Sequence, residues 1–490
     1  MAGPFKFPAT AMPAADLPAV VPEKPEAAID LRAGPCGGSF PSVENGEIGE
    51  TGGVPAIDWE GISSNSPNSS RGKTWRQPAI IPKDSVLAAW LTYAREQVEG
   101  ADSYIVGSIL PACAAMLARR VWFPWGDDRK FPNMFALLAG KPGDRKSSTI
   151  KLAAALARRL LPGDAFLPSN FSPESMFDEF ITRPDKVYIV DEGNTVLTDW
   201  QKGTNGERVA ARFLELYDCK GMSESFRRNK SDDEGCGSRS VEETSTSVLM
   251  GATFNVAAFQ GQVVRAGMAR RFLYYVADGH GRMIGIPKKN EGGLGRLAEI
   301  FKPFVEVSGP MEFTPEAEAL WLNLQEDNRA RIEAADPLAE AAISRLSSSP
   351  MQTLGVAMVF QLARWALSKT AARHRIEAET LMLAGQHVEE CLAAAEFLDS
   401  ISRRAEIADH GEVMLAKIRH EYREAARAGS IFLTRSDITR MFCHNTVRRG
   451  SLQTNDIYLR IIPELERKGL AKLIRKEPSE LYAFRVEGKV

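Results

Sequence analysis

The chain has 490 residues, of which 44% are hydrophobic and 25% are charged, and its formal net charge is -2. This length suggests about three domains of ordinary globular composition. The near-neutral charge excludes a uniformly polycationic nucleic-acid binder, so any DNA-binding surface has to be local.

Targeting and metal-binding signals are missing from the sequence. The six cysteines form no CxxC pair and have no zinc-type spacing to each other or to the six histidines, which predicts reduced thiols. The first residues lack the charged and apolar regions of a secretory signal. No clean apolar run reaches the roughly 18 residues of a membrane span, so we expect a cytoplasmic protein without a membrane partner.

The N-terminal part of the chain is expected to divide into a disordered leader, residues 1–78, and a helical segment, residues 79–131. The leader is rich in proline, glycine, serine and alanine and shows no sustained hydrophobic period. Asp84 and Ser85 are expected to cap a helix, because apolar residues follow them at helical spacing. A second helix is expected at 103–120.

Strands and helices alternate between residues 132 and 310. The expected strands are the apolar runs 135–139, 187–190, 247–252 and 272–276. The expected helices are 147–161, 172–181 and 206–219. This alternation predicts an α/β core with a parallel sheet that is covered by helices on both faces.

The rest of the chain divides into two parts. Residues 311–428 are helical in pattern, with breaks expected at Pro337 and at 347–350. Residues 429–490 show two short helices followed by two strand-like runs, which predicts a winged-helix-like module. Its inward-facing residues are expected to be Ile457, Ile461, Ile462 and Leu465.

The string GKPGDRKS, residues 140–147, resembles the phosphate-loop template G-x-x-x-x-G-K-[ST] and lies between an expected strand and an expected helix. Lys146 would reach the β- and γ-phosphates of ATP, and the Ser147 hydroxyl would bind Mg²⁺. Arg145 replaces the second glycine, so the loop alone leaves a basic surface turn equally open. The residues expected to contact the nucleotide are Gly140, Pro142, Gly143, Asp144, Arg145, Lys146, Ser147 and Ser148.

The string KVYIVDE, residues 186–192, is an apolar strand that ends in two acids. Asp191 could hold the hydrated Mg²⁺, and Glu192 could polarise the attacking water. Ligands bind outside the carboxyl ends of strands in open α/β sheets, where both motifs should meet. The alternative is a strand followed by an acidic turn, but the two motifs together predict a nucleotide site.

Five further residues are candidates for the same reaction. Thr253 and Asn255 follow the third expected strand, and either could position the water, with Asn255 preferred; the alternative is a strand-ending turn. Arg270 or Arg271 could stabilise phosphate charge in a neighbouring subunit, the alternative being a solvated arginine pair. Arg345 is a weaker candidate for a lid arginine, and a solvated helix residue is favoured there.

These motifs carry a resemblance over about residues 84–400. The runs FPNMFALLAGKPGDRKSS, YIVDEGNTVL, SVLMGATFN and GMARRFLYYV resemble the helicase-like P-loop ATPases of phages, plasmids and mobile elements. Those proteins are often fused to a primase-polymerase and are similar to viral primase-helicases and to the AAA+ class. No primase domain is visible here, so a separate primase would be a partner.

The resemblance implies an AAA+/RecA-like P-loop NTPase core that hydrolyses Mg-ATP. It implies self-assembly into a ring, for which a hexamer is expected, with single-stranded or forked DNA as partner. By position, Lys146 and Ser147 match the Walker A pair, and Asp191 and Glu192 match the Walker B pair. Asn255 matches the first sensor, and the finger arginine is one of the pair named above.

Two basic segments are candidates for DNA binding. Residues 431–490 carry 12 lysines and arginines against 7 acids, a net charge of +5, although a protein-docking module with solvated charges is the alternative. Arg227, Arg228 and Lys230 are pore-loop candidates, with a surface loop favoured. We therefore expect an ATP-dependent DNA helicase or translocase. The alternative is an AAA+ switch, such as a loader, transposition regulator or defence ATPase, that recruits partners without unwinding.

Overall fold

The structure is a computed structural model, and all of its described residues lie within Ile57–Val490. The described residues are 77–200, 203–226, 237–254, 267–277, 283–284, 291–336, 339–369, 371–422, 430–443, 457–476 and 480–485. The expected disordered leader lies outside them except for Gln77 and Pro78. No helix in this part of the chain has the length and apolarity to cross a membrane.

The core is a four-stranded parallel sheet, as the sequence predicts. Its strands are β3 (Phe135–Gly140), β4 (Asp185–Val190), β7 (Ser245–Thr253) and β8 (Phe272–Val276). They pair in the order β4-β7-β3-β8, and every pair is parallel. The carboxyl ends of β4, β7 and β3 therefore lie side by side at one edge.

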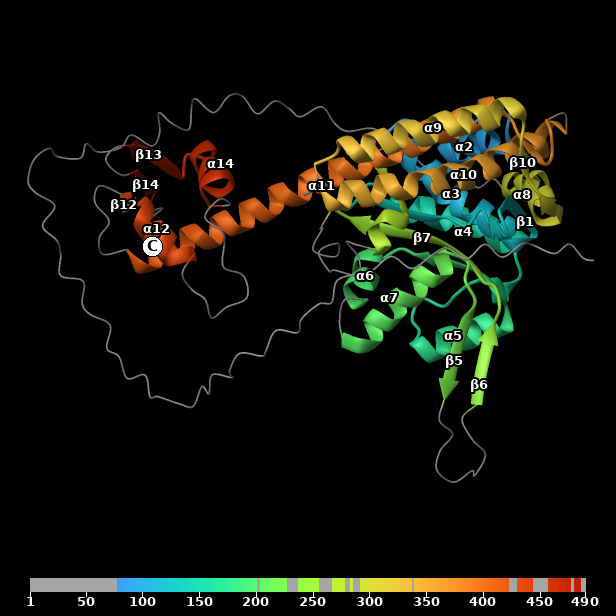
Figure 1. Ribbon diagram of the computed structural model, residues 1–490, viewed down its shortest axis with the longest axis horizontal. Coiled ribbons are helices and arrows are strands. Elements are labelled where there is room, and N and C mark those ends of the chain that lie inside the picture. The colour runs from blue at the N-terminus through green and yellow to red at the C-terminus, as the bar shows by residue number, and fades with distance from the viewer. Residues whose placement is uncertain are drawn as a thin grey trace, which may run out of the picture. The chain divides into compact units, whose positions relative to one another are not determined.

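Helices cover both faces of this sheet (Figure 1). Because strand side chains alternate, Ala136 and Leu138 of β3 enter one buried cluster, and Phe135 and Leu137 enter another. The first face is covered by α2 (Val86–Gln97), α3 (Asp102–Leu117) and α4 (Lys146–Leu160). The second face is covered by α5 (Pro173–Thr182), α6 (Gly193–Asp199) and α7 (Gly203–Tyr217).

The helix expected after Ser85 is confirmed as α2, and its apolar face is buried, namely Val86, Leu87, Trp90, Leu91 and Ala94. Ser85 occupies the N-cap position, but its side chain makes no cap hydrogen bond. The hydroxyl donates instead to the Pro82 carbonyl oxygen at 2.5 Å. Asp84 is not the cap either, because its carboxylate accepts from Arg364 at 3.0 Å.

A hairpin that the sequence analysis did not predict lies between α7 and β7. Its strands β5 (Met222–Phe226) and β6 (Gly237–Val241) pair antiparallel and extend away from the sheet (Figure 1). Residues 227–236 join the two strands. The pore-loop candidates Arg227, Arg228 and Lys230 belong to this connection and lie outside the described residues.

Short strands and long helices complete the region around the sheet. The short strands are β1 (Val121–Trp125), β2 (Asp128–Lys130), β9 (Gly309–Pro310), β10 (Glu312–Phe313) and β11 (Arg375–Ile376). The helices are α8 (Glu291–Glu306), α9 (Pro315–Ala334), α10 (Glu340–Ser368) and α11 (Ala378–Glu421). Pro337, an expected break, lies outside the described residues between α9 and α10.

Helix α10 continues through Pro350, so the break expected at 347–350 was wrong. Proline has no N–H for the carbonyl four residues earlier, which here belongs to Leu346. That oxygen instead accepts from Ser349 Oγ at 2.8 Å and from Asn328 Nδ2 of α9 at 3.1 Å. The freed carbonyl is thus satisfied by side chains, and the helix can go on.

The C-terminal residues form a separate small sheet with its own core. Strands β12 (Ser430–Thr434), β14 (Leu481–Arg485) and β13 (Ala471–Arg475) are antiparallel in that order. Their helical partners are α12 (Arg435–Cys443), the single turn Ile457–Ile461 and α14 (Ile462–Arg467). The predicted inward-facing residues Ile457, Ile461, Ile462 and Leu465 are all buried.

The open edge of β8 is covered by a side chain from the segment before α2. The Gln77 amide accepts from Val276 N at 3.0 Å and donates to the Tyr274 carbonyl oxygen at 3.2 Å. Gln77 is buried, so this residue, which the sequence analysis placed in the disordered leader, belongs to the folded part of the chain.

His387 of α11 is buried beside β8 and is neutral. Its Nδ1 lies 2.9 Å from the Ile80 carbonyl oxygen, which can only accept, so Nδ1 carries the proton. Its Nε2 then accepts from the Tyr275 hydroxyl at 2.9 Å. Burial lowers the pKa of His387 from 6.5 to about 4, and the hydrogen bond to Ile80 opposes this shift in part.

We expect the wild type to lose about 2 kcal/mol more unfolding free energy than His387→Gln when the pH falls from about 7 to about 5. The unfolded chain binds a proton at His387 with a pKa near 6.5, whereas the folded chain resists it down to about 4. This contribution is therefore complete above pH 6.5 and is lost as the pH falls toward 4. Urea titrations at the two pH values measure it, and equal losses in both proteins would contradict it.

Candidate nucleotide site

A cavity of about 330 Å³ lies at the carboxyl edge of the sheet. Three segments that are far apart in the sequence line it: residues 142–148, residues 191–192 with Asn194, and residues 251–253. The first follows β3, the second follows β4 and the third ends β7. The structure thus brings together the two motifs that the sequence analysis expected to meet here.

The first segment is a tight loop between β3 and α4. Gly140 ends the strand where there is no room for a side chain, because a Cβ there would overlap the Tyr104 hydroxyl. That hydroxyl donates to the Ala139 carbonyl oxygen at 2.8 Å and accepts from Ala277 N at 3.1 Å, so it fixes the strand ends. Within the loop, the buried Asp144 carboxylate accepts from Lys141 N at 2.6 Å.

Arg145 adopts the left-handed conformation that the template assigns to its second glycine. Its φ is 61° and its ψ is 21°, and Gly143 also has a positive φ of 92°. The Arg145 guanidinium leaves the loop and pairs with Glu99, Nε to Oε2, at 3.1 Å. The departure from the template therefore changes the residue but keeps a turn of glycine-like geometry.

Arg145→Gly is expected to change the free energy of unfolding by less than about 1 kcal/mol, whereas Arg145→Val should destabilise by about 1–2 kcal/mol. Glycine relieves the left-handed strain but loses an exposed ion pair and adds chain entropy. Valine loses the pair and keeps the strain with a β-branched side chain. Urea unfolding of the three proteins decides, and a strongly destabilised glycine variant would show that the Glu99 pair holds the loop.

Lys146 begins α4 and folds back over the loop. Its Nζ donates to the carbonyl oxygens of Gly140 at 2.9 Å and Lys141 at 2.7 Å. Burial lowers the pKa of Lys146, and the charges of Asp144 and Glu192 oppose this shift in part. The N-cap residue Arg145 makes no side-chain cap hydrogen bond to α4, so its side chain leaves the first N–H groups of the helix uncapped. The loop is thus a concave surface of N–H donors with one ammonium group.

The two acids after β4 differ in their surroundings. Asp191 Oδ1 is buried and has no hydrogen-bond partner among the residues that the structure describes, while Oδ2 lies 3.8 Å from Lys151 Nζ. Glu192 is exposed, and its carboxylate makes no hydrogen bond or ion pair to a described residue. A buried carboxylate oxygen without a partner suits a hydrated cation.

The residues present fit a magnesium ion rather than a metal held by the protein alone. Asp191 and Ser147 offer the oxygen ligands that Mg²⁺ prefers, and both line the cavity. The described parts of the chain contain no group of three or more His, Cys, Asp or Glu side chains that could hold a metal. A cation here would therefore need further oxygens from water or from a phosphate ligand.

The end of β7 contains one expected site residue, and it contacts a second residue that the sequence analysis did not select. Thr253 lines the cavity, whereas the preferred Asn255 lies outside the described residues. Asn194, which the sequence analysis did not select, also lines the cavity. Its Oδ1 accepts from Thr253 N at 3.2 Å, and its Nδ2 donates to the Thr253 hydroxyl. The only sequence signal for Asn194 is its place two residues after Glu192.

The arginine candidates do not line the cavity. Arg271 is buried and is engaged within its own chain, by Asp218 at 3.0 Å and the Gly267 carbonyl oxygen at 2.9 Å, so it is no solvated arginine. Arg270 is half-buried, and its guanidinium makes no hydrogen bond or ion pair to a described residue. Arg345 is buried and pairs with Asp399, so the expectation of a solvated helix residue was wrong there.

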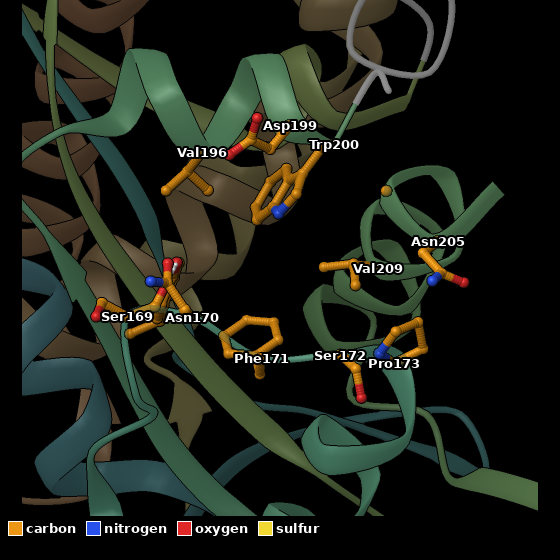
Figure 2. Close-up of a pocket in the computed structure, with 12 residues that line it drawn as sticks. Ser169, Asn170, Phe171, Ser172, Pro173, Val196, Asp199, Trp200, Asn205 and Val209 are labelled. Carbon is orange, nitrogen blue, oxygen red and sulfur yellow. Dashed lines mark hydrogen bonds between the residues drawn. The ribbon is translucent and has the colours of Figure 1, made fainter. Parts of the chain in front are cut away.

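A second cavity, of about 360 Å³, lies on the other side of α6. Figure 2 shows Trp200 and Phe171 facing it from opposite sides, with Asn170 and Asn205 at its margins. Among the described residues, its lining includes none of the predicted site residues and no lysine or arginine. Of the two cavities, the first therefore has the described lysine and loop that suit a phosphate ligand.

Three chain segments therefore meet at one site, and its described lining combines backbone N–H groups, a lysine, three hydroxyls and three carboxylates. This set of groups is suited to a polyphosphate with a divalent cation. Comparison with known proteins assigns no family to the chain, because no protein-family model matches it and no curated protein matches its sequence.

Proposed function

We propose that this protein is an ATPase that uses Mg-ATP hydrolysis to move on DNA, as a ring-shaped helicase or translocase. The observation that carries the proposal is the shared cavity of Lys146, Ser147, Asp191 and Glu192 at the carboxyl edge of the sheet. A basic surface turn or an acidic turn alone would give no reason for these four groups to meet.

Each group has a role in the proposed reaction. The N–H groups at the start of α4 and the Lys146 ammonium would bind the β- and γ-phosphates. Ser147 and Asp191 would hold Mg²⁺, which neutralises charge on those phosphates when it is bound. The exposed Glu192 carboxylate would accept a proton from the attacking water, and Thr253 stands across the cavity where it could orient that water.

The order of the strands supports a P-loop core of the AAA+/RecA-like class. Strand β7 lies between β3, which leads into the loop, and β4, which carries the acids. This order places Thr253 between the two motifs rather than at the far edge of the sheet. A residue at the carboxyl end of β7 is therefore close to both the loop and the acids.

Two features support DNA as the partner. The β5–β6 hairpin extends from the core and carries the basic run with Arg227, Arg228 and Lys230 in its connection. The C-terminal module follows the order helix, strand, helix, helix, strand, strand, counting the end of α11 that packs into its core, which suits a winged helix. Lys472 and Lys476 are exposed there, whereas Arg467 is paired with Glu464.

A ring would bring an arginine from one subunit to the nucleotide of the next. Arg270 fits this role better than Arg271, because the latter is held by Asp218 within its own chain. A separate primase would be a further partner, since the resemblance is to proteins that carry that activity as a fused domain.

The test is the steady-state rate of ATP hydrolysis with and without single-stranded DNA, followed by strand separation on a forked duplex. Stimulation of several-fold with unwinding supports the motor. Lys146-dependent hydrolysis that DNA leaves unchanged favours the alternative, an ATP switch that recruits partners. An absence of Lys146-dependent hydrolysis under both conditions overturns the proposed function.

The charge-reversal pair Lys472→Glu and Lys476→Glu is expected to weaken single-stranded DNA binding and to flatten its salt dependence. Each lost phosphate contact lowers the slope of log affinity against log salt by about 0.7. A matched control reverses two exposed charges elsewhere, Lys302→Glu and Arg329→Glu, and should leave the slope unchanged. Equal effects of the two pairs would show that overall charge, rather than the C-terminal module, determines DNA binding.

A further inference from the structure

The turn that carries the two acids lies in close backbone contact with β7, and a glycine on each side permits this contact. A Cβ at Gly193 would lie 2.7 Å from the Gly251 carbonyl oxygen, and a Cβ at Gly251 would lie 2.9 Å from the Asp191 carbonyl oxygen. Both distances are shorter than real side chains allow. The backbones of the turn and of β7 therefore approach more closely than any other residue pair would permit.

Because of this close approach, Asn194 lies beside β7 at the point where β4 no longer pairs with it. Strand β4 pairs with β7 as far as Val190 opposite Met250, and then the chain turns away. Beyond that point the Asn194 side-chain amide takes over, since it accepts from Thr253 N at 3.2 Å and donates to the Thr253 hydroxyl. The amide oxygen thus takes the place of a strand carbonyl toward Thr253 N, while the amide N–H group binds the Thr253 side chain rather than the backbone of β7.

The position of Glu192 depends on this connection. The Glu192 carboxylate makes no hydrogen bond or ion pair to a described residue, so its place is set by its backbone. That backbone leads directly into α6, where Thr195 N and Val196 N donate to the Glu192 carbonyl oxygen at 3.1 and 3.3 Å. The side chain that joins this helix start to β7 at the cavity is Asn194.

We propose that Asn194 is a positioning residue, which holds the Glu192 carboxylate in register with Thr253 across the nucleotide cavity. The inference rests on the proposed ATPase function and adds to it a residue that touches neither the phosphates nor the water. Reaction rates depend steeply on such register, because a misplacement of about 1 Å can cost about 100-fold.

The experiment measures kcat and KM for ATP, together with the Kd of Mg-ADP and the melting temperature. Asn194→Ala is expected to lower kcat by about 10- to 100-fold while Kd changes by less than about twofold. Thr253→Val, which removes the hydroxyl and keeps the shape, should also lower kcat. Thr253→Ser keeps the hydroxyl and should recover most of the rate that Thr253→Val loses.

Coupling distinguishes positioning from two independent effects. If Asn194 acts through Thr253, the double variant Asn194→Ala with Thr253→Val is no slower than the slower single variant. Thr198→Val is the matched control on the same helix, because the Thr198 hydroxyl donates to the Asn194 backbone carbonyl at 2.7 Å rather than to its amide. It should leave kcat unchanged.

The outcomes separate this inference from the function on which it rests. A wild type with Lys146-dependent hydrolysis and an Asn194→Ala variant with unchanged kcat would overturn the positioning role alone. Multiplicative losses in the double variant, or a loss of rate that follows a loss of Mg-ADP binding and melting temperature, would overturn it too. A wild type without hydrolysis overturns the ATPase proposal itself. The Kd of Mg-ADP then shows separately whether the cavity binds a nucleotide.

Discussion

Replacing Lys146 with alanine is expected to reduce the rate of ATP hydrolysis by at least about 100-fold. The Lys146 ammonium is held over the loop by the carbonyl oxygens of Gly140 and Lys141. It therefore lies where it could bind phosphate oxygens. There it would neutralise the negative charge that develops while the phosphoryl group is transferred. Alanine removes that charge and leaves the loop backbone in place.

The control for this variant is Lys141→Ala, in the same loop. The Lys141 side chain is exposed and does not line the cavity, so its loss should leave the rate within about twofold of the wild type. Steady-state hydrolysis and nucleotide binding are measured for both variants. If they lose equal activity, general loop charge matters and a specific role for Lys146 is wrong.

Glu192→Gln is expected to lower kcat by about 100-fold or more, while Mg-ADP binding persists. The amide keeps the shape of the side chain but cannot accept the proton of the attacking water. Glu192 is exposed at the cavity and makes no ion pair that the change would break within the described residues. Loss of rate should therefore occur without loss of stability.

Asp199→Asn is the matched carboxylate-to-amide control, since Asp199 lies at the other end of α6 and lines the second cavity. It should leave kcat unchanged. Single-turnover hydrolysis and melting temperature distinguish the two variants. A Glu192→Gln protein that hydrolyses ATP at the wild-type rate would show that another residue activates the attacking water. It would favour the alternative that Asp191 and Glu192 form only an acidic turn after the strand.

Local spacing was enough to predict the parts of the site that lie along one segment. An apolar run, a glycine loop and a helix in succession predicted β3, the loop and α4, and an apolar run with two acids predicted β4 with Asp191. The expected strand 272–276 matches β8 residue for residue. These features depend on neighbours in the sequence, where hydrophobic period and turn residues are informative.

Features that depend on distant partners could not be predicted in this way. Asn194 acquires its role from Thr253, and helix α10 passes Pro350 because Asn328 of another helix reaches the freed carbonyl. Arg271 was one of two candidates for a finger arginine, but it is bound by Asp218 within its own chain. The β5–β6 hairpin has no alternating apolar pattern, so its polar strands resembled a loop.

The amide of Gln77 has a consequence for solubility as well as for the fold. An edge strand with unpaired N–H and C=O groups is a template on which a strand of another molecule can add. Gln77 occupies Val276 N and the Tyr274 carbonyl oxygen, and Gln352 donates to the Phe272 carbonyl oxygen at 3.4 Å, so side chains block that template at β8. A shortened protein that starts after Pro78 would leave Val276 N and the Tyr274 carbonyl oxygen without the Gln77 amide, and it would be more prone to aggregate through strand addition even though every residue of the nucleotide cavity remained.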